Sequence, residues 1–306
     1  MLAIFALIIA NVIWGAASPI FKYALTDMPP FTLAFIRFFF AGLIFLPFIS
    51  RKIHHIKGKY LMHVIVGGIW GVSINVAFFF QGLNLVSSIN APIIGAMGPL
   101  VLYVLSLFIL KEKPHPQIMK GILFALTGVL IIVFAPLLRS PITHASEYSI
   151  TSQIMGNTFF ILAMLGAALH VIHTKKVANK VDPITLTGIQ FFVGAISFLP
   201  FMIAELQTWS FSSLTQSSWI GIIYGIFFSS ALGYVSQNYA IKKLPAQKVG
   251  IFSYMMPVVA VIVAMPLLGE YPDIFFLFGT LFVVVGIFIS EKNPSLHNIE
   301  KKLHKK

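Results

Sequence analysis

The sequence predicts an all-α integral membrane protein with ten transmembrane helices, and three observations lead to this prediction. Hydrophobic residues make up 58% of the 306-residue chain and charged residues only 10%, and the mean hydropathy is +0.91. A soluble domain has about 25% charged residues. The apolar residues fall in runs of roughly 18–23, each long enough to cross a ~30 Å hydrocarbon core as a helix. This composition excludes a soluble enzyme, a nucleic-acid-binding protein and a disordered protein.

Ten apolar runs are expected to cross the membrane, and short connections join them. In chain order the expected spans are Leu2–Tyr23, Phe31–Ile49, Tyr60–Gly82, Ile89–Leu110, Gln117–Pro136, Gln153–Thr174, Ile184–Ile203, Ser218–Ile241, Gln247–Leu268 and Asp273–Ser290. The first run has the length of a signal-peptide core. However, no basic residue precedes it and it continues to Tyr23, so we expect it to be the first span.

The distribution of Lys and Arg predicts the orientation of the chain. With the N-terminus in the cytoplasm, 18 of the 21 basic residues lie on the cytoplasmic side, namely Arg51, Lys52, Lys57, Lys59, Lys111, Lys113, Lys120, Lys175, Lys176, Lys180, Lys242, Lys243, Lys248, Lys292, Lys301, Lys302, Lys305 and Lys306. The other side receives Lys22 and Arg139, and Arg37 lies inside the second span. By the positive-inside rule both termini are cytoplasmic, in an inner or plasma membrane. The net charge of +12 therefore reflects topology, and no nucleic-acid partner is expected.

Prolines, glycines and a glutamate recur in the two halves of the chain at nearly constant offsets. Matches at 153, 154 and 158 residues include Pro30 with Pro183, Thr32 with Thr185, Gly67 and Gly71 with Gly221 and Gly225, and Pro99, Glu112, Pro114, Gly121 and Gly128 with Pro257, Glu270, Pro272, Gly279 and Gly286. We expect one five-helix repeat in residues 1–150, a second in 151–290, and a basic cytoplasmic tail in 291–306. Five is an odd number of crossings, so the second repeat is inverted. Secondary transporters use inverted repeats, with the substrate site near the midplane.

Several of these residues also give the chain a family resemblance. They are Trp14-Gly15, Lys22, Pro30, Arg37, and the ordered set Pro99, Glu112, Gly121 and Gly128 with its second copy Pro257, Leu268-Gly269-Glu270, Gly279 and Gly286. In this order on ten spans, the chain resembles an EamA-type member of the drug/metabolite transporter superfamily over nearly its whole length. The resemblance implies a ten-helix exporter of small metabolites, with amino acids as frequent substrates. The second half departs from the pattern at Gln190, which occupies the repeat position that corresponds to Arg37.

Polar and aromatic residues within the spans are the expected substrate contacts, because they can line a cavity near the midplane. They are Asn11, Trp14, Asn75, Tyr103, His170, Tyr234, Gln237 and Tyr254. The alternative for each is ordinary contact between helices or with the membrane interface. His170 is favoured because it lies mid-span and its ring titrates near neutrality.

Five further residues are expected to act in hinges or gates. Pro99 and Pro257 lie near the middle of their spans, where each would kink the helix for gating or simply for packing. Glu112 and Glu270 lie at span ends on opposite faces, as latches to a cation or helix N-terminus, or as hairpin caps. Arg37 lies about two turns into its span, where it has a partner or reaches back to the interface.

The function that the sequence predicts is a secondary transporter that exports small metabolites, such as amino acids or related amphipathic compounds, by alternating access. The sequence has no Walker loop, no His-Glu-x-x-His motif and no Cys, so we expect no ATP site, metal or cofactor. The alternatives are proton-coupled efflux of multiple drugs or organic cations and, in another class, a membrane-embedded enzyme. All nine acids lie in loops or at span ends, which favours facilitated efflux and leaves histidines such as His63 and His170 for proton exchange. The expected partners are the substrate and the lipid bilayer, with the chain as a monomer or homodimer.

Overall fold

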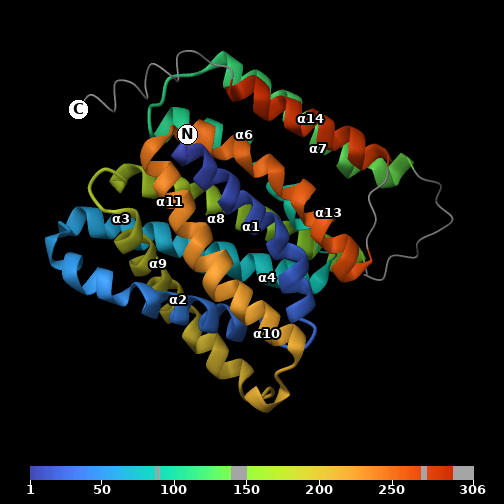
Figure 1. Cartoon of the computed structure of the whole chain (residues 1–306). Helices are drawn as coiled ribbons and strands as arrows, with labels where there is room; N and C mark the ends of the chain where they lie inside the picture. The colour runs from blue at the N-terminus through green and yellow to red at the C-terminus, as the bar shows by residue number, and fades with distance from the viewer. Residues whose placement is uncertain (87, 89, 139–149, 270–273, 292–306) are drawn as a thin grey trace.

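The structure, a computed structural model, describes residues 1–86, 88, 90–138, 150–269 and 274–291. All regular structure in these residues is helical, and the helices form one bundle (Figure 1). The first five expected spans fall on α1 (Leu2–Ala24), α2 (Pro30–Lys52) with the 3₁₀ turn η1 (Ile53–His55), α3 (Gly58–Gly68) with η2 (Ile69–Ile74) and α4 (Asn75–Leu85), α5 (Asn90–Gly95) with α6 (Gly98–Ile109), and α7 (Pro116–Leu138).

The other five expected spans follow the same order of elements. They fall on α8 (Ile150–Val177), α9 (Pro183–Glu205), α10 (Gln216–Ile223) with η4 (Tyr224–Leu232) and α11 (Gly233–Lys243), α12 (Ala246–Ile251) with η5 (Phe252–Tyr254) and α13 (Met255–Leu268), and α14 (Ile274–Glu291). A short 3₁₀ turn, η3 (Phe211–Ser213), lies in the connection after α9. Seven helical segments of the described chain are long and apolar enough to cross a membrane, so the protein is a multi-pass membrane protein.

The fourth span of each half is not one continuous α-helix, although the apolar run Ile89–Leu110 is long enough to be one. In the first half α5 ends at Gly95 and α6 begins at Gly98, whereas in the second half the 3₁₀ turn η5 separates α12 from α13. Pro99 and Pro257 lie in the first turn of α6 and of α13. A proline has no N–H, and its ring crowds the preceding turn, so it is tolerated best at a helix start. The interruption therefore precedes each proline.

The third span of each half contains a π-helical stretch, η2 in the first half and η4 in the second. Each stretch includes a glycine against which a side chain of another helix packs. A Cβ added at Gly71 would lie 2.3 Å from the His170 ring, and one added at Gly225 would lie 3.3 Å from Cδ of Arg37. These glycines thus make room inside the bundle for the side chains of His170 and Arg37.

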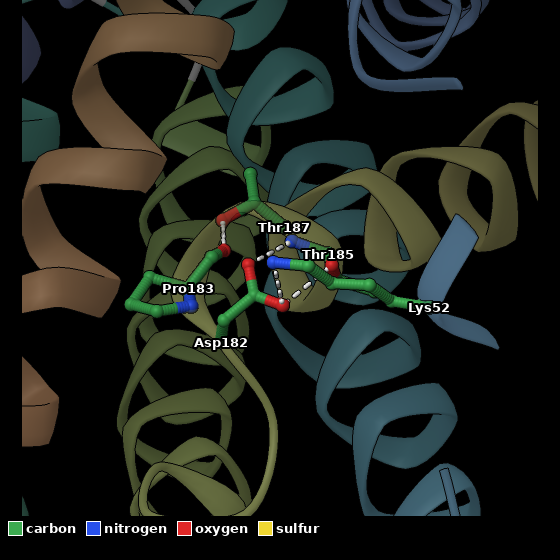
Figure 2. A network of polar contacts seen from close by, with 5 residues as sticks. All are labelled: Lys52, Asp182, Pro183, Thr185 and Thr187. Atoms are coloured by element: carbon green, nitrogen blue, oxygen red, sulfur yellow. Dashed lines mark hydrogen bonds and ion pairs between the residues drawn. The ribbon is translucent and has the colours of Figure 1, made fainter. Parts of the chain in front are cut away.

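Helices α2 and α9 pack along each other, and a carboxylate caps the N-terminus of each. Asp182 precedes α9 and accepts hydrogen bonds from the backbone N–H (3.1 Å) and hydroxyl (2.7 Å) of Thr185, while Nζ of Lys52 lies 3.3 Å from its Oδ2 (Figure 2). At the other end Glu205, the last residue of α9, accepts from the backbone N–H groups of Phe31 (3.1 Å) and Thr32 (2.6 Å). An N-cap contributes about 0.5–2 kcal/mol, more than an exposed ion pair.

The Asp182 cap remains ionised over the ordinary pH range. Partial burial raises the pKa of this carboxyl, but the hydrogen bonds from Thr185 and the Lys52 ammonium lower it further, so the pKa lies below its usual value of 3.8. Because the pKa is lower in the folded protein, the stabilisation is present above pH 3.8 and is lost as the pH falls through the lowered value.

Helices α7 and α14 lie side by side along one edge of the bundle (Figure 1), and glycines allow their backbones to touch. A Cβ added at Gly128 would lie 2.3 Å from the carbonyl oxygen of Gly279, and one added at Gly286 would lie 2.6 Å from that of Gly121. Small residues spaced along a helix permit this close approach in membrane proteins. The four glycines are repeat positions of the sequence, and here they serve packing.

Candidate functional site

A cavity of about 210 Å³ lies between helices of both halves of the chain. Its lining comes from α1, α2, η2, α4, α5 and α6 in the first half and from α8, η4, α11, α12, η5 and α13 in the second. Most of the lining is apolar, with Phe21, Phe79 and Phe160 among its aromatic residues. Two interrupted helices, α5–α6 and α12–α13, therefore both contribute to the cavity.

Six of the eight substrate contacts expected from the sequence line this cavity. They are Asn11, Trp14, Asn75, His170, Tyr234 and Gln237. Tyr103 and Tyr254 do not line it, because both side chains are buried in an apolar cluster that includes Ile118 and Ile122 of α7. The Tyr254 hydroxyl donates to the carbonyl of Ile122 at 3.4 Å. These two tyrosines hold helices together.

Trp14 and Tyr234 form a rigid aromatic corner of the cavity. Their rings meet edge to face, with the centroids 5.1 Å apart. Nε1 of Trp14 donates to the carbonyl of Ser229 at 3.0 Å, and the Tyr234 hydroxyl donates to the carbonyl of Gly71 at 2.8 Å. The Trp14 N–H and the Tyr234 hydroxyl are thus both used in hydrogen bonds that fix the two rings. The aromatic ring surfaces remain to contact a ligand in the cavity.

Two asparagines give the cavity neutral hydrogen-bond acceptors. Nδ2 of Asn11 donates to the carbonyl of Leu7, and Nδ2 of Asn75 donates to the carbonyl of Ala163, each at 2.7 Å. The two Oδ1 atoms accept no hydrogen bond from any residue that the structure describes. Because both residues line the cavity, these oxygens are the acceptors that they bring to a donor there.

His170 lines the cavity but is almost fully buried, with 2% of its surface exposed. Its Nδ1 lies 3.0 Å from the carbonyl oxygen of Gly67, which only accepts, so Nδ1 carries a proton. The other ring nitrogen, Nε2, lies near the Asn238 side chain but forms no hydrogen bond with any described residue. Outside the cavity, Nδ1 of His63 and Nδ1 of His173 lie 3.2 Å apart.

Arg37 lies beside the cavity and not at the membrane interface, because only 3% of its surface is exposed. Nε donates to the Ser230 hydroxyl at 2.7 Å, and Nη2 donates to that of Ser229 at 3.0 Å. The guanidinium also lies over the rings of Phe21 and Phe38, 5.0 and 4.5 Å from their centroids. The interpretation that Arg37 reaches back to the interface is wrong, since the π-helical segment η4 covers it.

Among the described residues, no Asp or Glu forms an ion pair with Arg37. A buried charge without an opposite charge retains a desolvation cost of about several kcal/mol. Each hydroxyl or ring offsets about 0.5–3 kcal/mol of it. The repeat counterpart Gln190 does not line the cavity, and its Nε2 lies 3.4 Å from the Val64 carbonyl and the Thr174 hydroxyl. The positive charge is therefore confined to one half.

Glu112 caps a helix of the other half of the chain. Its carboxylate accepts from the backbone N–H groups of Ala246 (2.9 Å) and Gln247 (3.4 Å) at the start of α12. Of the partners expected for Glu112, the structure thus places a helix N-terminus at its carboxylate. The positive end of a helix favours a carboxylate. Its counterpart Glu270 lies outside the described residues.

Two lysines cap helix C-termini at matching places in the two halves. Nζ of Lys22 donates to the carbonyls of Leu83 and Val86 at the end of α4. Nζ of Lys175 donates to those of Ile241 and Leu244 at the end of α11. Lys22 and Lys175 are 153 residues apart in the sequence. Their acceptor carbonyls correspond at an offset of 158 residues, Leu83 to Ile241 and Val86 to Leu244, and both numbers are offsets of the repeat. We missed the Lys175 match in the sequence, although it stands at the same offset as Pro30 and Pro183.

A bundle of apolar, membrane-crossing helices around a cavity with a few fixed polar groups is the architecture of a multi-pass membrane transporter. The chain belongs to the EamA-like transporter family, whose model matches residues 1–134 and 154–291.

Curated relatives of the chain are also named as transporters. It is 26% identical to YetK, an uncharacterized transporter of Bacillus subtilis, over 94% of this chain and 87% of the relative. It is 24% identical to a probable amino-acid metabolite efflux pump of Salmonella typhimurium and 23% identical to one of Escherichia coli. Those matches cover 94% and 91% of this chain and 93% and 91% of the pumps. A solved crystal structure with 18% identity superposes with a TM-score of 0.71 over 94% of this chain and 96% of that one, which shows a shared fold.

Proposed function

We propose that this transporter exports small amphipathic metabolites, amino acids among them, by alternating access to the cavity. The supporting observation is the cavity itself, which is enclosed by both halves and combines aromatic walls with a few fixed polar groups. Such a lining suits a ligand with an apolar body and one polar end. Two relatives named as probable amino-acid metabolite efflux pumps support the direction and the substrate class.

We further propose that ten helices cross the membrane as two inverted five-helix repeats, in residues 1–150 and 151–290, with both termini in the cytoplasm. The paired π-helical stretches, the paired interruptions before Pro99 and Pro257, and the paired lysine caps support two copies of one unit. The excess of Lys and Arg in alternate connections supports the orientation.

This topology predicts that single cysteines at Lys57 and Gln207 react from opposite sides of the membrane. Both residues are exposed, and they follow α2 and α9, the second helices of the two halves. Because the chain contains no Cys, labelling has no background. In intact cells an impermeant maleimide should modify Gln207→Cys and not Lys57→Cys, which should react only after permeabilisation. Equal labelling of both variants in intact cells would contradict the inverted arrangement.

The export activity is tested with purified protein in liposomes that are loaded with amino acids and related metabolites. We expect efflux down the substrate gradient when ionophores hold the pH and the membrane potential constant, because no described acid lines the cavity to couple a proton. Empty liposomes give the background rate. No efflux of any loaded metabolite would contradict the proposal. Accumulation driven by a pH gradient alone would instead favour the proton-coupled alternative, for which the His63–His173 contact is the structural candidate.

A further inference from the structure

We infer that Arg37 binds the carboxylate of the transported metabolite, so that the cavity accepts carboxylates with an apolar body and rejects organic cations. The transport of carboxylates rests on the proposed function. The binding of a carboxylate rests only on the geometry of the Arg37 side chain and on the charges around the cavity.

Two of the three guanidinium nitrogens of Arg37 are hydrogen-bonded to serine hydroxyls, and the third has no partner among the described residues. Nε and Nη2 are occupied by the hydroxyls of Ser230 and Ser229, whereas Nη1 donates no hydrogen bond to any described residue. Nη1 is therefore the nitrogen of the guanidinium that no described residue occupies. Arg37 is among the residues that line the cavity, which brings this donor to the site where a ligand would bind.

The donor left on Arg37 suits a carboxylate. The guanidinium carbon lies over the rings of Phe21 and Phe38, 5.0 and 4.5 Å from their centroids. With two rings against the group and two of its nitrogens bound to serine hydroxyls, Nη1 is the donor left for a ligand. Planar carboxylates bind guanidinium groups through charge-assisted hydrogen bonds.

The charges around the cavity favour an anion over a cation. Arg37 is a permanent positive charge, and none of the described lining residues is an Asp or Glu. The free amide oxygens of Asn11 and Asn75 can accept from an ammonium group, but they bring no negative charge. An amino-acid zwitterion is thus tolerated through its carboxylate, whereas an amine without a carboxylate meets a buried cation and no counter-ion.

The apolar part of the ligand has a matching surface. Phe21 both covers the guanidinium and lines the cavity, and Trp14 and Phe79 extend the aromatic lining from α1 and α4. A carboxylate placed at Arg37 therefore leaves its hydrocarbon body against these rings. The expected ligands are aromatic or branched-chain carboxylates of small size.

The test uses three probes with the same phenylpropyl body and different charge, namely 3-phenylpropionate, 3-phenylpropanamide and 3-phenylpropylamine. Their affinities for the purified full-length protein in detergent are measured by isothermal titration calorimetry at pH 7. Hydrogen bonds to charged groups are stronger than neutral ones, so the anion should bind at least about tenfold more tightly than the amide, and the amine should not bind detectably. Tighter or equal binding of the amine would overturn the inference.

Substitutions at Arg37 assign the preference to this residue. Arg37→Gln, which introduces the residue present at the repeat position 190, should reduce the affinity for the anion to that for the amide. Arg37→Lys keeps the charge without the planar edge, so it should retain part of the preference. Lys120→Gln removes an exposed charge outside the cavity and should change nothing. A full preference for the anion in Arg37→Gln would overturn the inference. If that variant does not fold, an undiminished preference for the anion in Arg37→Lys, or no preference in the wild type, would overturn it.

Binding and transport separate this inference from the proposed function. Arg37-dependent binding of 3-phenylpropionate, with no efflux of any loaded metabolite from liposomes, would contradict export and support the carboxylate site. Efflux of carboxylates at equal rates by the wild type and by Arg37→Gln, with equal binding, would support export and overturn the site.

Discussion

Replacing Trp14 by alanine should lower the initial rate of efflux at least about tenfold without lowering the amount of protein in the membrane. Trp14 is half-buried at the aromatic corner of the cavity, where its ring contacts Tyr234 and its Nε1 is bound to the Ser229 carbonyl. Loss of one large apolar contact with a ligand is worth about 1.5–3 kcal/mol, and about 1.4 kcal/mol corresponds to a factor of ten. Rates are measured in liposomes and divided by the quantity of reconstituted protein.

The matched control for Trp14 is Trp219→Ala. Trp219 is the same residue type on α10, but it is 53% exposed on the outside of the bundle and does not line the cavity. We expect this variant to transport at the wild-type rate within about a factor of two, since exposed positions are energetically tolerant. An unchanged rate in Trp14→Ala would place the substrate site elsewhere. Equal loss in both variants would point to a general effect of losing a tryptophan.

Replacing Gly128 by leucine should produce the largest loss of stability. The added Cβ would lie 2.3 Å from the carbonyl oxygen of Gly279 and 2.7 Å from Cβ of Phe282. Neither α7 nor α14 can yield locally, because the nearest contact is with backbone, so the two helices must separate. Overpacking of a tight contact costs about 1–3 kcal/mol or more. Thermal unfolding of the purified protein in detergent should show a lower Tm, together with a reduced yield from membranes.

Gly58→Leu is the matched control for this substitution. A Cβ added at Gly58, in the first turn of α3, meets no atom within 4 Å. The same change of residue should therefore leave Tm near the wild-type value. If Gly128→Leu were as stable as Gly58→Leu, the close contact between α7 and α14 would be contradicted.

The positions of the helices could be predicted from the sequence, because each apolar run is long and is bounded by polar or helix-breaking residues. The interruptions could not be located in the same way. Pro99 and Pro257 mark each broken span, but a proline restricts the turn that precedes it, and so the break falls before each proline and not around it. The π-helical stretches have no sequence signal beyond Gly71 and Gly225.

The candidate site was predicted less completely, because an apolar span does not reveal which of its faces points inward. Tyr103 and Tyr234 are both tyrosines within spans, yet the first packs against α7 and the second lines the cavity. The depth of Arg37 in its span follows from the sequence, but the direction of its side chain does not. Lys175 adds to the charge distribution, and its offset from Lys22 is also that of the repeat.

The cap on α2 also has a consequence for how the protein is made. The N–H groups of Phe31 and Thr32 are bound by Glu205, which the ribosome adds 173 residues after Thr32. At about 5–20 residues per second this delay is roughly 9–35 s. During that time α2 is already complete, while its first turn has no acceptor from the chain. Biosynthesis therefore closes this helix end only after α9 has been made, and a nascent chain of 52 to 204 residues contains α2 without the Glu205 cap.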